Sequence, residues 1–212
     1  MAEVREIRLN PSGTGAAQSD DPLTSLVSWQ PMVPGGSNFR TQRLHATPGC
    51  LVLRRSLGGI LFACVFAVPG TLAVLAAVPL ALAIDGDGWM FGGFMLVWGA
   101  LFGGAGWYML LSHKPLCFDA RAGVYFRGKA YVHGGGQPKE RQGALASIQA
   151  LQLLAERVRG SGRGSRSFTS HELNLVLDDG FRVNVMDHGG DIEECARQLA
   201  DLLDVPVWKG TR

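Results

Sequence analysis

Four arginines gather in one glycine- and serine-rich stretch of the chain, RVRGSGRGSRS. They are Arg157, Arg159, Arg163 and Arg166. A flexible basic loop at a membrane surface attracts anionic lipid head groups, at about 1 kcal/mol per charge near the surface. These arginines are therefore the candidate lipid- or anion-binding site. The competing interpretation is a solvated loop that only improves solubility, and no GxxxxGK[ST] or GxGxxG phosphate-binding motif accompanies them.

The cysteines and histidines are too scattered to predict a catalytic or metal site. Cys50, Cys64, Cys117 and Cys195 form no CxxC pair, so neither a disulfide framework nor a zinc site is expected. An enzyme would have to use Cys195 with His188, but a nucleophilic cysteine needs a base within reach in an electropositive setting. Cys195 lies on the apolar stripe of a predicted helix, which favours a core position. We expect no enzyme activity and no cofactor.

Two long apolar runs joined by a short Asp-Gly turn occupy the middle of the chain. Ser56–Ser112 contains no Lys or Arg, although the chain has 20 of them. The runs, Leu57–Ile84 and Trp89–Leu111, each exceed the roughly 20 residues that cross about 30 Å of hydrocarbon as a helix. A buried hairpin of a soluble protein would need polar faces, and neither run has one. Residues 56–112 are therefore predicted to be a transmembrane hairpin.

Charge predicts the orientation of this hairpin. The turn carries only Asp85 and Asp87, whereas basic residues flank the other end of each run. The flanking set is Arg5, Arg8, Arg40, Arg43, Arg54 and Arg55 before the first run, and His113, Lys114, Arg121, Arg127 and Lys129 after the second. Basic residues near span ends stay cytoplasmic, so both termini are expected in the cytosol. The net charge of only +2 gives no indication of a nucleic-acid partner.

Small residues within the apolar runs predict close helix packing. Gly59, Ala63 and Ala67 form a stripe on the first run, and Gly99 and Gly103 form a GxxxG pair on the second. Such stripes let helix backbones approach closely. The two spans are expected to pack on each other, and the alternative is homodimerisation through one stripe. Since neither run contains a charged residue or a histidine, a transport pathway is not expected.

The segments that flank the hairpin predict a small β domain. Residues 1–28 mix small and polar residues without periodicity and are expected to be disordered. Residues 29–55 contain a first β-hairpin, with strands over Phe39–Ala46 and Cys50–Arg54, or else a loop. In residues 113–212 the first expected strands are Leu116–Asp119 and Val124–Arg127, with Ala130–His133 as a further extension of the sheet.

Two later segments differ in how clearly they predict a strand. Ala144–Glu156 is ambiguous because its composition favours a helix, and we favour a strand over Ala150–Val158 because its neighbours are strands. Glu172–Leu177 and Phe181–Met186 flank a three-residue Asp-Asp-Gly turn and predict a hairpin. Its expected pairs are Leu177 with Phe181, Leu175 with Val183, and Leu173 with Val185 on one face, and Asn174 with Asn184 on the other, solvated face.

A C-terminal amphipathic helix is expected over residues 191–203. Asp191 with Glu194 three residues later is typical of a capping box, and Pro206 ends the helix. The apolar positions at helical spacing would cover one face of the sheet; they are Ile192, Cys195, Leu199, Leu202 and Leu203.

This run of strands closed by a helix resembles the bacterial pleckstrin-homology-like (PH-like) domains attached to a two-helix membrane hairpin. The segments GGSNFRTQRL, HELNLVLDDGFRVNVMDH and VPVW are similar to those of uncharacterised bacterial membrane proteins, from about Trp29 to Trp208. The resemblance implies membrane-proximal scaffolding, or binding of lipids or proteins, at the bacterial inner membrane. It supplies no catalytic residues.

The expected fold is α+β. A two-helix transmembrane hairpin is attached to, or inserted into, a small antiparallel β domain that a C-terminal amphipathic helix closes. The expected function is a non-enzymatic inner-membrane protein whose cytosolic PH-like domain binds protein or anionic lipid. The alternative is a membrane subunit or an immunity-type inhibitor that acts through the hairpin. The expected partners are the lipid bilayer and a protein or a second copy, with no nucleic acid and no small-molecule substrate.

Overall fold

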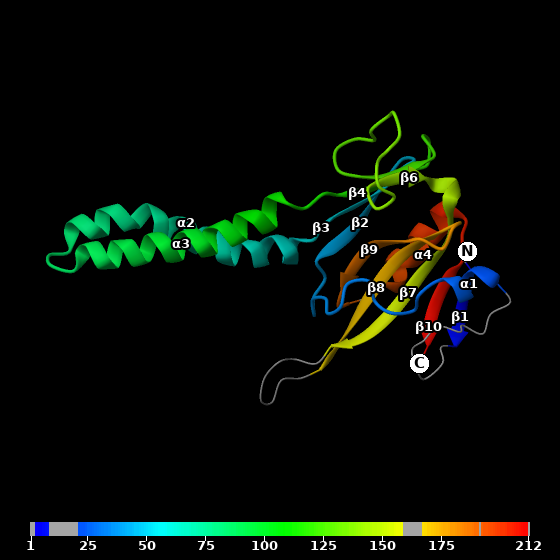
Figure 1. Ribbon diagram of the computed structural model, residues 1–212, viewed down its shortest axis with the longest axis horizontal. Coiled ribbons are helices and arrows are strands. Elements are labelled where there is room, and N and C mark those ends of the chain that lie inside the picture. Colours follow the sequence, from blue (N-terminus) through cyan, green and yellow to red (C-terminus); the bar gives the residue numbers. More distant parts are fainter. Residues whose placement is uncertain (1–2, 9–20, 159–166, 191, 212) are drawn as a thin grey trace. The chain divides into compact units, whose positions relative to one another are not determined.

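The computed structural model describes residues 3–8, 21–158, 167–190 and 192–211. The chain divides into two units, one formed by Met1–Arg54 with Lys114–Arg212 and the other by Arg55–His113. The first unit contains two β-sheets and the second is a pair of helices (Figure 1).

The helical unit consists of α2 (Leu57–Ala83) and α3 (Gly88–Leu111). Both lie within one residue of their predicted bounds. The Ser56 hydroxyl begins α2 by accepting a hydrogen bond from the Gly59 N–H at 3.1 Å, a usual N-cap arrangement. Both helices are long and apolar enough to cross a membrane, with mean hydropathy of 2.4 for α2 and 1.5 for α3.

Most of the apolar surface of these helices is open. Only 28% of the most apolar stretch of α2 and 17% of that of α3 is buried. Large side chains such as Leu82 and Leu111 are more than three-quarters exposed, at 83% and 77%. A core helix of a water-soluble domain buries its apolar face, so this exposure distinguishes the pair from such core helices.

One sheet contains the first and last strands of the chain, and we call it the terminal sheet. Its order is β1 (Val4–Arg8), β10 (Val207–Thr211), β7 (Ile148–Val158), β8 (Phe168–Leu177) and β9 (Arg182–His188). The β1–β10 and β10–β7 pairs are parallel, whereas β7–β8 and β8–β9 are antiparallel. The segment 148–158 is therefore a strand, as favoured from its neighbours.

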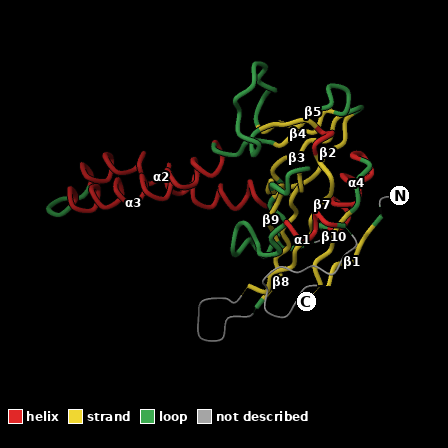
Figure 2. The backbone as a smooth tube through the Cα atoms, turned by 45° about the vertical axis from the view of Figure 1, so that its right-hand side comes forward, coloured by secondary structure: helices red, strands yellow, loops and turns green. Residues whose placement is uncertain are grey.

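The other sheet is antiparallel and follows the chain order, and we call it the meander sheet. Its strands are β2 (Gln42–Thr47), β3 (Cys50–Arg55), β4 (Leu116–Asp119), β5 (Val124–Arg127) and β6 (Gln142–Ala144) (Figure 2). The strands over 116–119 and 124–127 have their predicted bounds. Although α2 and α3 separate β3 from β4 in the chain, the two strands pair directly, with Leu53 opposite Leu116.

The two sheets and the C-terminal helix share one core. Side chains from β7, β8 and β9 pack with those of the meander sheet, including fully buried Phe118 and Tyr125. Helix α4 (Glu193–Leu203) adds Ala196, Leu199 and Ala200 to the same cluster. The amphipathic helix therefore covers an apolar sheet face, as its periodicity predicts.

The described residues at the start of α4 do not test the expected capping box. Asp191 lies outside the described residues, and Ile192 at the cap position makes no side-chain capping bond. The Glu194 carboxylate instead contacts Arg197 at 2.9 Å. At the other end, Asp204 takes a left-handed conformation with φ of 54°, which ends the helix before Pro206.

The expectation of a disordered tail over residues 1–28 is wrong for the parts that the structure describes. β1 pairs with β10, and α1 (Pro22–Leu26) begins at Asp21, whose carboxylate accepts a bond from the Leu23 N–H at 3.0 Å. Ile7, Val27 and Trp29 form a second apolar cluster on the outer face of the terminal sheet. Most residues of this segment are small and polar, so its composition gives little indication of the few apolar contacts that order it.

The expected extension of the sheet over residues 130–133 is wrong. These residues form no strand, because the Gln142 side chain takes the place of a neighbouring strand. Its amide oxygen accepts from the Val132 N–H at 3.0 Å, and its amide nitrogen donates to the Val132 carbonyl at 2.8 Å.

The predicted register of the β8–β9 hairpin is right near the turn and wrong beyond it. Leu175 lies opposite Val183 and Asn174 opposite Asn184, but Leu173 pairs with Met186 instead of Val185. A β-bulge after Asn184 places both Val185 and Met186 at buried positions, and an extra residue of this kind shifts all later pairs by one.

Ile7 tests whether the N-terminal segment belongs to the fold. It is 2% exposed, whereas Val4 on the same strand is 51% exposed. Ile7→Ala should lower the free energy of unfolding by about 2–5 kcal/mol, the usual cost of truncating a buried isoleucine. Val4→Ala should change it little. Urea unfolding of the detergent-solubilised chain, followed by tryptophan fluorescence, measures both, and equal stability of the two variants would contradict the assignment of β1.

Candidate interaction site

A strap formed by residues 28–38 crosses the outer face of the terminal sheet. The buried Glu172 carboxylate of β8 accepts hydrogen bonds from the Met32 N–H at 2.9 Å and the Val33 N–H at 3.0 Å. Farther along the strap, the Glu156 carboxylate of β7 accepts one from the Gly35 N–H at 3.0 Å. Carboxylates of the sheet thus accept hydrogen bonds from strap N–H groups that would otherwise need a strand as their partner.

A polar network beneath the strap continues from Glu172. Asn174 is fully buried and donates to the Glu172 carboxylate at 2.6 Å. Arg182 donates to the Gln30 carbonyl at 2.9 Å and to the Gln152 amide oxygen at 3.1 Å. Burial lowers the pKa of Arg182, and attraction to Glu172 opposes that shift. The expectation of a solvated Asn174–Asn184 pair is therefore wrong, because the strap covers Asn174.

The end of the strap lies against the end of β9. Ser37 forms a parallel bridge with His188, and the Ser170 hydroxyl donates to the Asp187 carboxylate at 3.1 Å. Burial raises the pKa of Asp187, with Glu172 and Glu156 adding to the increase and the Ser170 bond opposing it. A side chain on Gly36 would collide with Ser170 and Asp187, so this position requires glycine.

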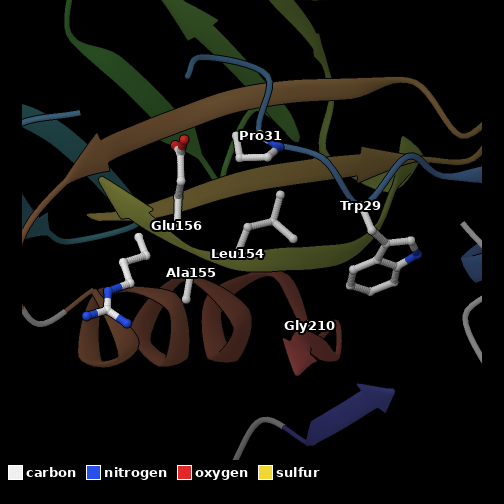
Figure 3. Close-up of a pocket in the computed structure, with 7 residues that line it drawn as sticks. Trp29, Pro31, Leu154, Ala155, Glu156 and Gly210 are labelled. Carbon is white, nitrogen blue, oxygen red and sulfur yellow. The ribbon is translucent and has the colours of Figure 1, made fainter. Parts of the chain in front are cut away.

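A cavity of about 230 Å³ opens between the strap and β7. Figure 3 shows Leu154 between Trp29 and Glu156, with Pro31 of the strap above them. Trp29 and Leu154 are almost completely buried, so they form an apolar floor, while Glu156 and Arg157 add one charge of each sign. Sites for drug-sized ligands usually have about 300–1,000 Å³. The cavity is sized for one side chain instead.

Among the described residues, no strand pairs with the edge of β7 that borders this cavity, and we call it the open edge. The ladder between β10 and β7 ends where Lys209 lies opposite Leu153, although β7 continues to Val158. The Leu151 N–H donates toward β10, to the Pro206 carbonyl at 2.9 Å. Backbone groups alternate sides along a strand, so those of Ala155 and Arg157 also point to the β10 side, beyond the end of the ladder.

Of the four candidate arginines, the structure places one. Arg157 is exposed near the end of β7 and donates to the Ser167 hydroxyl at 3.2 Å from both Nε and Nη2. Arg159, Arg163 and Arg166 lie outside the described residues. The lipid or anion site stays a prediction, and Arg157 itself borders the cavity.

The candidate helix-packing residues lie mostly between α2 and α3. Ala63, Ala67, Gly99 and Gly103 are buried, whereas Gly59 is half-buried. A Cβ on Gly99 would come within 2.6 Å of the Gly70 carbonyl oxygen, which only a glycine avoids. These small residues thus pack between α2 and α3. This is the first interpretation, in which the two spans pack on each other, rather than homodimerisation.

His188 and Cys195 occupy structural positions. His188 is 1% exposed, and its Nδ1 donates to the Gly189 carbonyl at 2.7 Å. Cys195 is half-buried on α4 and packs against the shared core. Within the described ranges no group of three potential metal ligands occurs.

Sequence reasoning missed the strap and the cavity that it covers. The signal that could have indicated them is polar Glu172 and Asn174 on one face of an otherwise apolar strand. The strand pattern predicts a solvated Asn174 because no segment is expected to cross that face.

His188 predicts a pH dependence of stability. Burial lowers its pKa from the ordinary 6.5, and Arg40 and His171 lower it further, while its bond to Gly189 opposes the shift. The folded state therefore binds fewer protons than the unfolded state, and stability falls as the pH drops through 6.5. Asp187 has the opposite sign, since its raised pKa favours the folded state as the pH falls toward 3.8.

In urea unfolding of the full chain in detergent, the wild-type midpoint should thus fall between pH 7.5 and 5.5. His188→Gln should show a smaller fall because glutamine does not titrate. Parallel pH profiles for the two proteins would show that protonation of His188 is not coupled to unfolding.

Comparison with protein-family models, with curated proteins and with solved structures finds no match to this chain. Its function is therefore argued from its own residues.

Proposed function

We propose that this chain is a non-enzymatic, membrane-anchored binding protein. In this proposal α2 and α3 cross the bilayer as a hairpin, and the two-sheet unit is a PH-like domain into which the hairpin is inserted. The domain binds an extended segment of a protein partner at the edge of β7.

The open apolar surface of the helices supports the membrane anchor. Neither helix has a polar face, and both are long enough to span about 30 Å of hydrocarbon. Trp89 and Tyr108, near opposite ends of α3, are 71% and 73% exposed. Aromatic residues at these positions are typical of the two membrane interfaces.

The order of the strands supports a PH-like domain with an insertion. The resemblance rests on a run of strands closed by a helix, which α4 provides here, and β3 and β4 are neighbours on either side of the helical pair. β1 and β10 extend the terminal sheet beyond β7, and the strap crosses its outer face.

The open edge of β7 is the observation that carries the binding proposal. An extended peptide can add to a strand edge through its backbone, while pockets for its side chains supply specificity. Here Ala155 offers its backbone groups beyond the ladder, and the cavity over Leu154 accepts one apolar side chain. Glu156 and Arg157 on the same segment can discriminate between charged neighbours of that side chain.

Protein binding is the function that the cavity and the strand edge support. A strand edge beside a pocket for one side chain has the features of peptide recognition. The hairpin-based alternative loses part of its motivation, since the small-residue stripes pack between α2 and α3.

Reporter fusions test the anchor and its orientation. A fluorescent protein fused after residue 212 should fold and fluoresce in the cytosol, since the basic flanks favour cytosolic termini. Alkaline phosphatase inserted at the turn between α2 and α3 should be active outside the cytosol. Phosphatase activity after residue 212, or a full chain that stays in solution without detergent, would contradict the proposal.

Position 155 tests the binding edge. Ala155→Pro removes the N–H that lies beyond the last pair of the β10–β7 ladder and spares the β7–β8 ladder, and proline is tolerated at strand edges. Ala155→Thr is the matched control because it keeps the N–H and favours a strand. With a photo-crosslinking residue at position 157 in living cells, the control should crosslink to a protein. The proline variant should lose about tenfold in yield, equivalent to about 1.4 kcal/mol.

A peptide with the sequence of the crosslinked segment should then bind the purified full chain in detergent, more weakly to the proline variant. Crosslinks to lipid alone, or equal yields from both variants, would contradict strand addition.

A further inference from the structure

Two cysteines that sequence spacing did not connect lie side by side. Cys50 on β3 and Cys117 on β4 have their Sγ atoms 2.8 Å apart. Non-bonded heavy atoms usually approach to about 3.5–4.0 Å, and a disulfide bond is about 2.05 Å long. The two thiols are thus within a small side-chain movement of covalent bonding.

We propose that Cys50 and Cys117 form a reversible disulfide that joins β3 to β4. In the antiparallel register Cys50 lies opposite Asp119 and Cys117 opposite Val52, so the cysteines are diagonal neighbours on one face of the meander sheet. That face points away from the shared core, since the alternating residues Leu51, Leu53, Leu116 and Phe118 are the buried ones. Both thiols are half-buried and therefore open to a small oxidant.

The oxidant is a small-molecule disulfide. One protein thiolate attacks one sulfur of that molecule, which forms a mixed disulfide and releases one small thiol. The second cysteine loses its proton to solvent and attacks the protein sulfur of the mixed disulfide, which releases the other small thiol. Two protein thiols are thus oxidised by two electrons in total, and one small disulfide is reduced to two thiols.

The surroundings of the pair make the reaction depend on pH. Burial raises the pKa of Cys117 to about 12, and the neighbouring Cys50 and Asp119 contribute to the increase. Because the thiolate is the attacking form, the disulfide should form faster as the pH rises.

The position of the bond gives it a structural consequence. A disulfide here would close a loop that contains all of α2 and α3, and it would fix the two strands from which the helical pair leaves and returns. Loop closure of this kind stabilises the folded state mainly by restricting the unfolded chain. In a reducing cytosol, where the proposed orientation of the hairpin puts this domain, such bonds are usually transient.

The test uses the full chain in detergent with oxidised glutathione as the oxidant. After acid quenching and alkylation, peptide mapping should identify a Cys50–Cys117 crosslinked peptide. Cys64 and Cys195 should stay alkylatable, and dithiothreitol should restore all four thiols. The oxidised protein should unfold at a higher temperature than the reduced one. Mixed disulfides without the crosslinked peptide, or alkylation of all four cysteines after prolonged excess oxidant, would overturn the proposal.

Two variants test whether both thiols are needed. Cys117→Ser should stop at a mixed disulfide of glutathione at Cys50, and Cys50→Ser should stop at one at Cys117. Cys195→Ser is the matched control, a half-buried cysteine outside the pair, and it should form the Cys50–Cys117 bond at the wild-type rate. A disulfide to Cys64 or Cys195 in either variant, formed as fast as the wild-type bond, would overturn the assignment of the pair.

Discussion

The pairing of β3 with β4 is the constraint on which the rest of the structure depends. These strands supply Leu53, Leu116 and Phe118 to the shared core, yet the entire helical pair separates them in the chain. The pairing requires a helical segment that turns back on itself. Gly70, Gly99 and Gly103 permit this because their missing side chains allow the helix backbones to meet. The fold of the β domain therefore depends on the helical segment that connects these two strands, and the cysteine pair lies between the same two strands.

Local patterns predicted much of the fold. The bounds of β4, β5 and both long helices follow from residue types within each segment, and the Asp-Asp-Gly turn gives the correct register near Leu175 and Val183. β7 was ambiguous because residues 150–154 are all buried. A strand covered on both faces loses the alternation that identifies strands covered on one. The composition of that segment then resembles a buried helix.

What could not be predicted depends on contacts between distant segments. β1 and β10 are parallel neighbours from opposite ends of the chain, and each is short and only partly apolar. The strap has no periodicity, since its backbone bonds mainly to Glu172 and Glu156 side chains and meets a strand at a single bridge, Ser37 with His188. The bulge after Asn184 has no glycine to mark it. Of the candidate site, only Arg157 was found in advance, and the reason given for it was charge rather than its place beside a cavity.

Burial of polar groups explains why the strap is a fixed part of the proposed binding surface. An unpaired buried carboxylate is costly, and the strap supplies Glu172 with two backbone N–H partners besides Asn174. Arg182, which is half-buried, holds the strap through the Gln30 carbonyl. That requirement fixes Trp29 and Pro31 above β7 and creates the cavity at its edge. The network beneath the strap therefore holds the pocket in one conformation before a partner binds. Because ordering a pocket during binding reduces affinity, this arrangement suits recognition of a short extended segment, for which the total contact area is small.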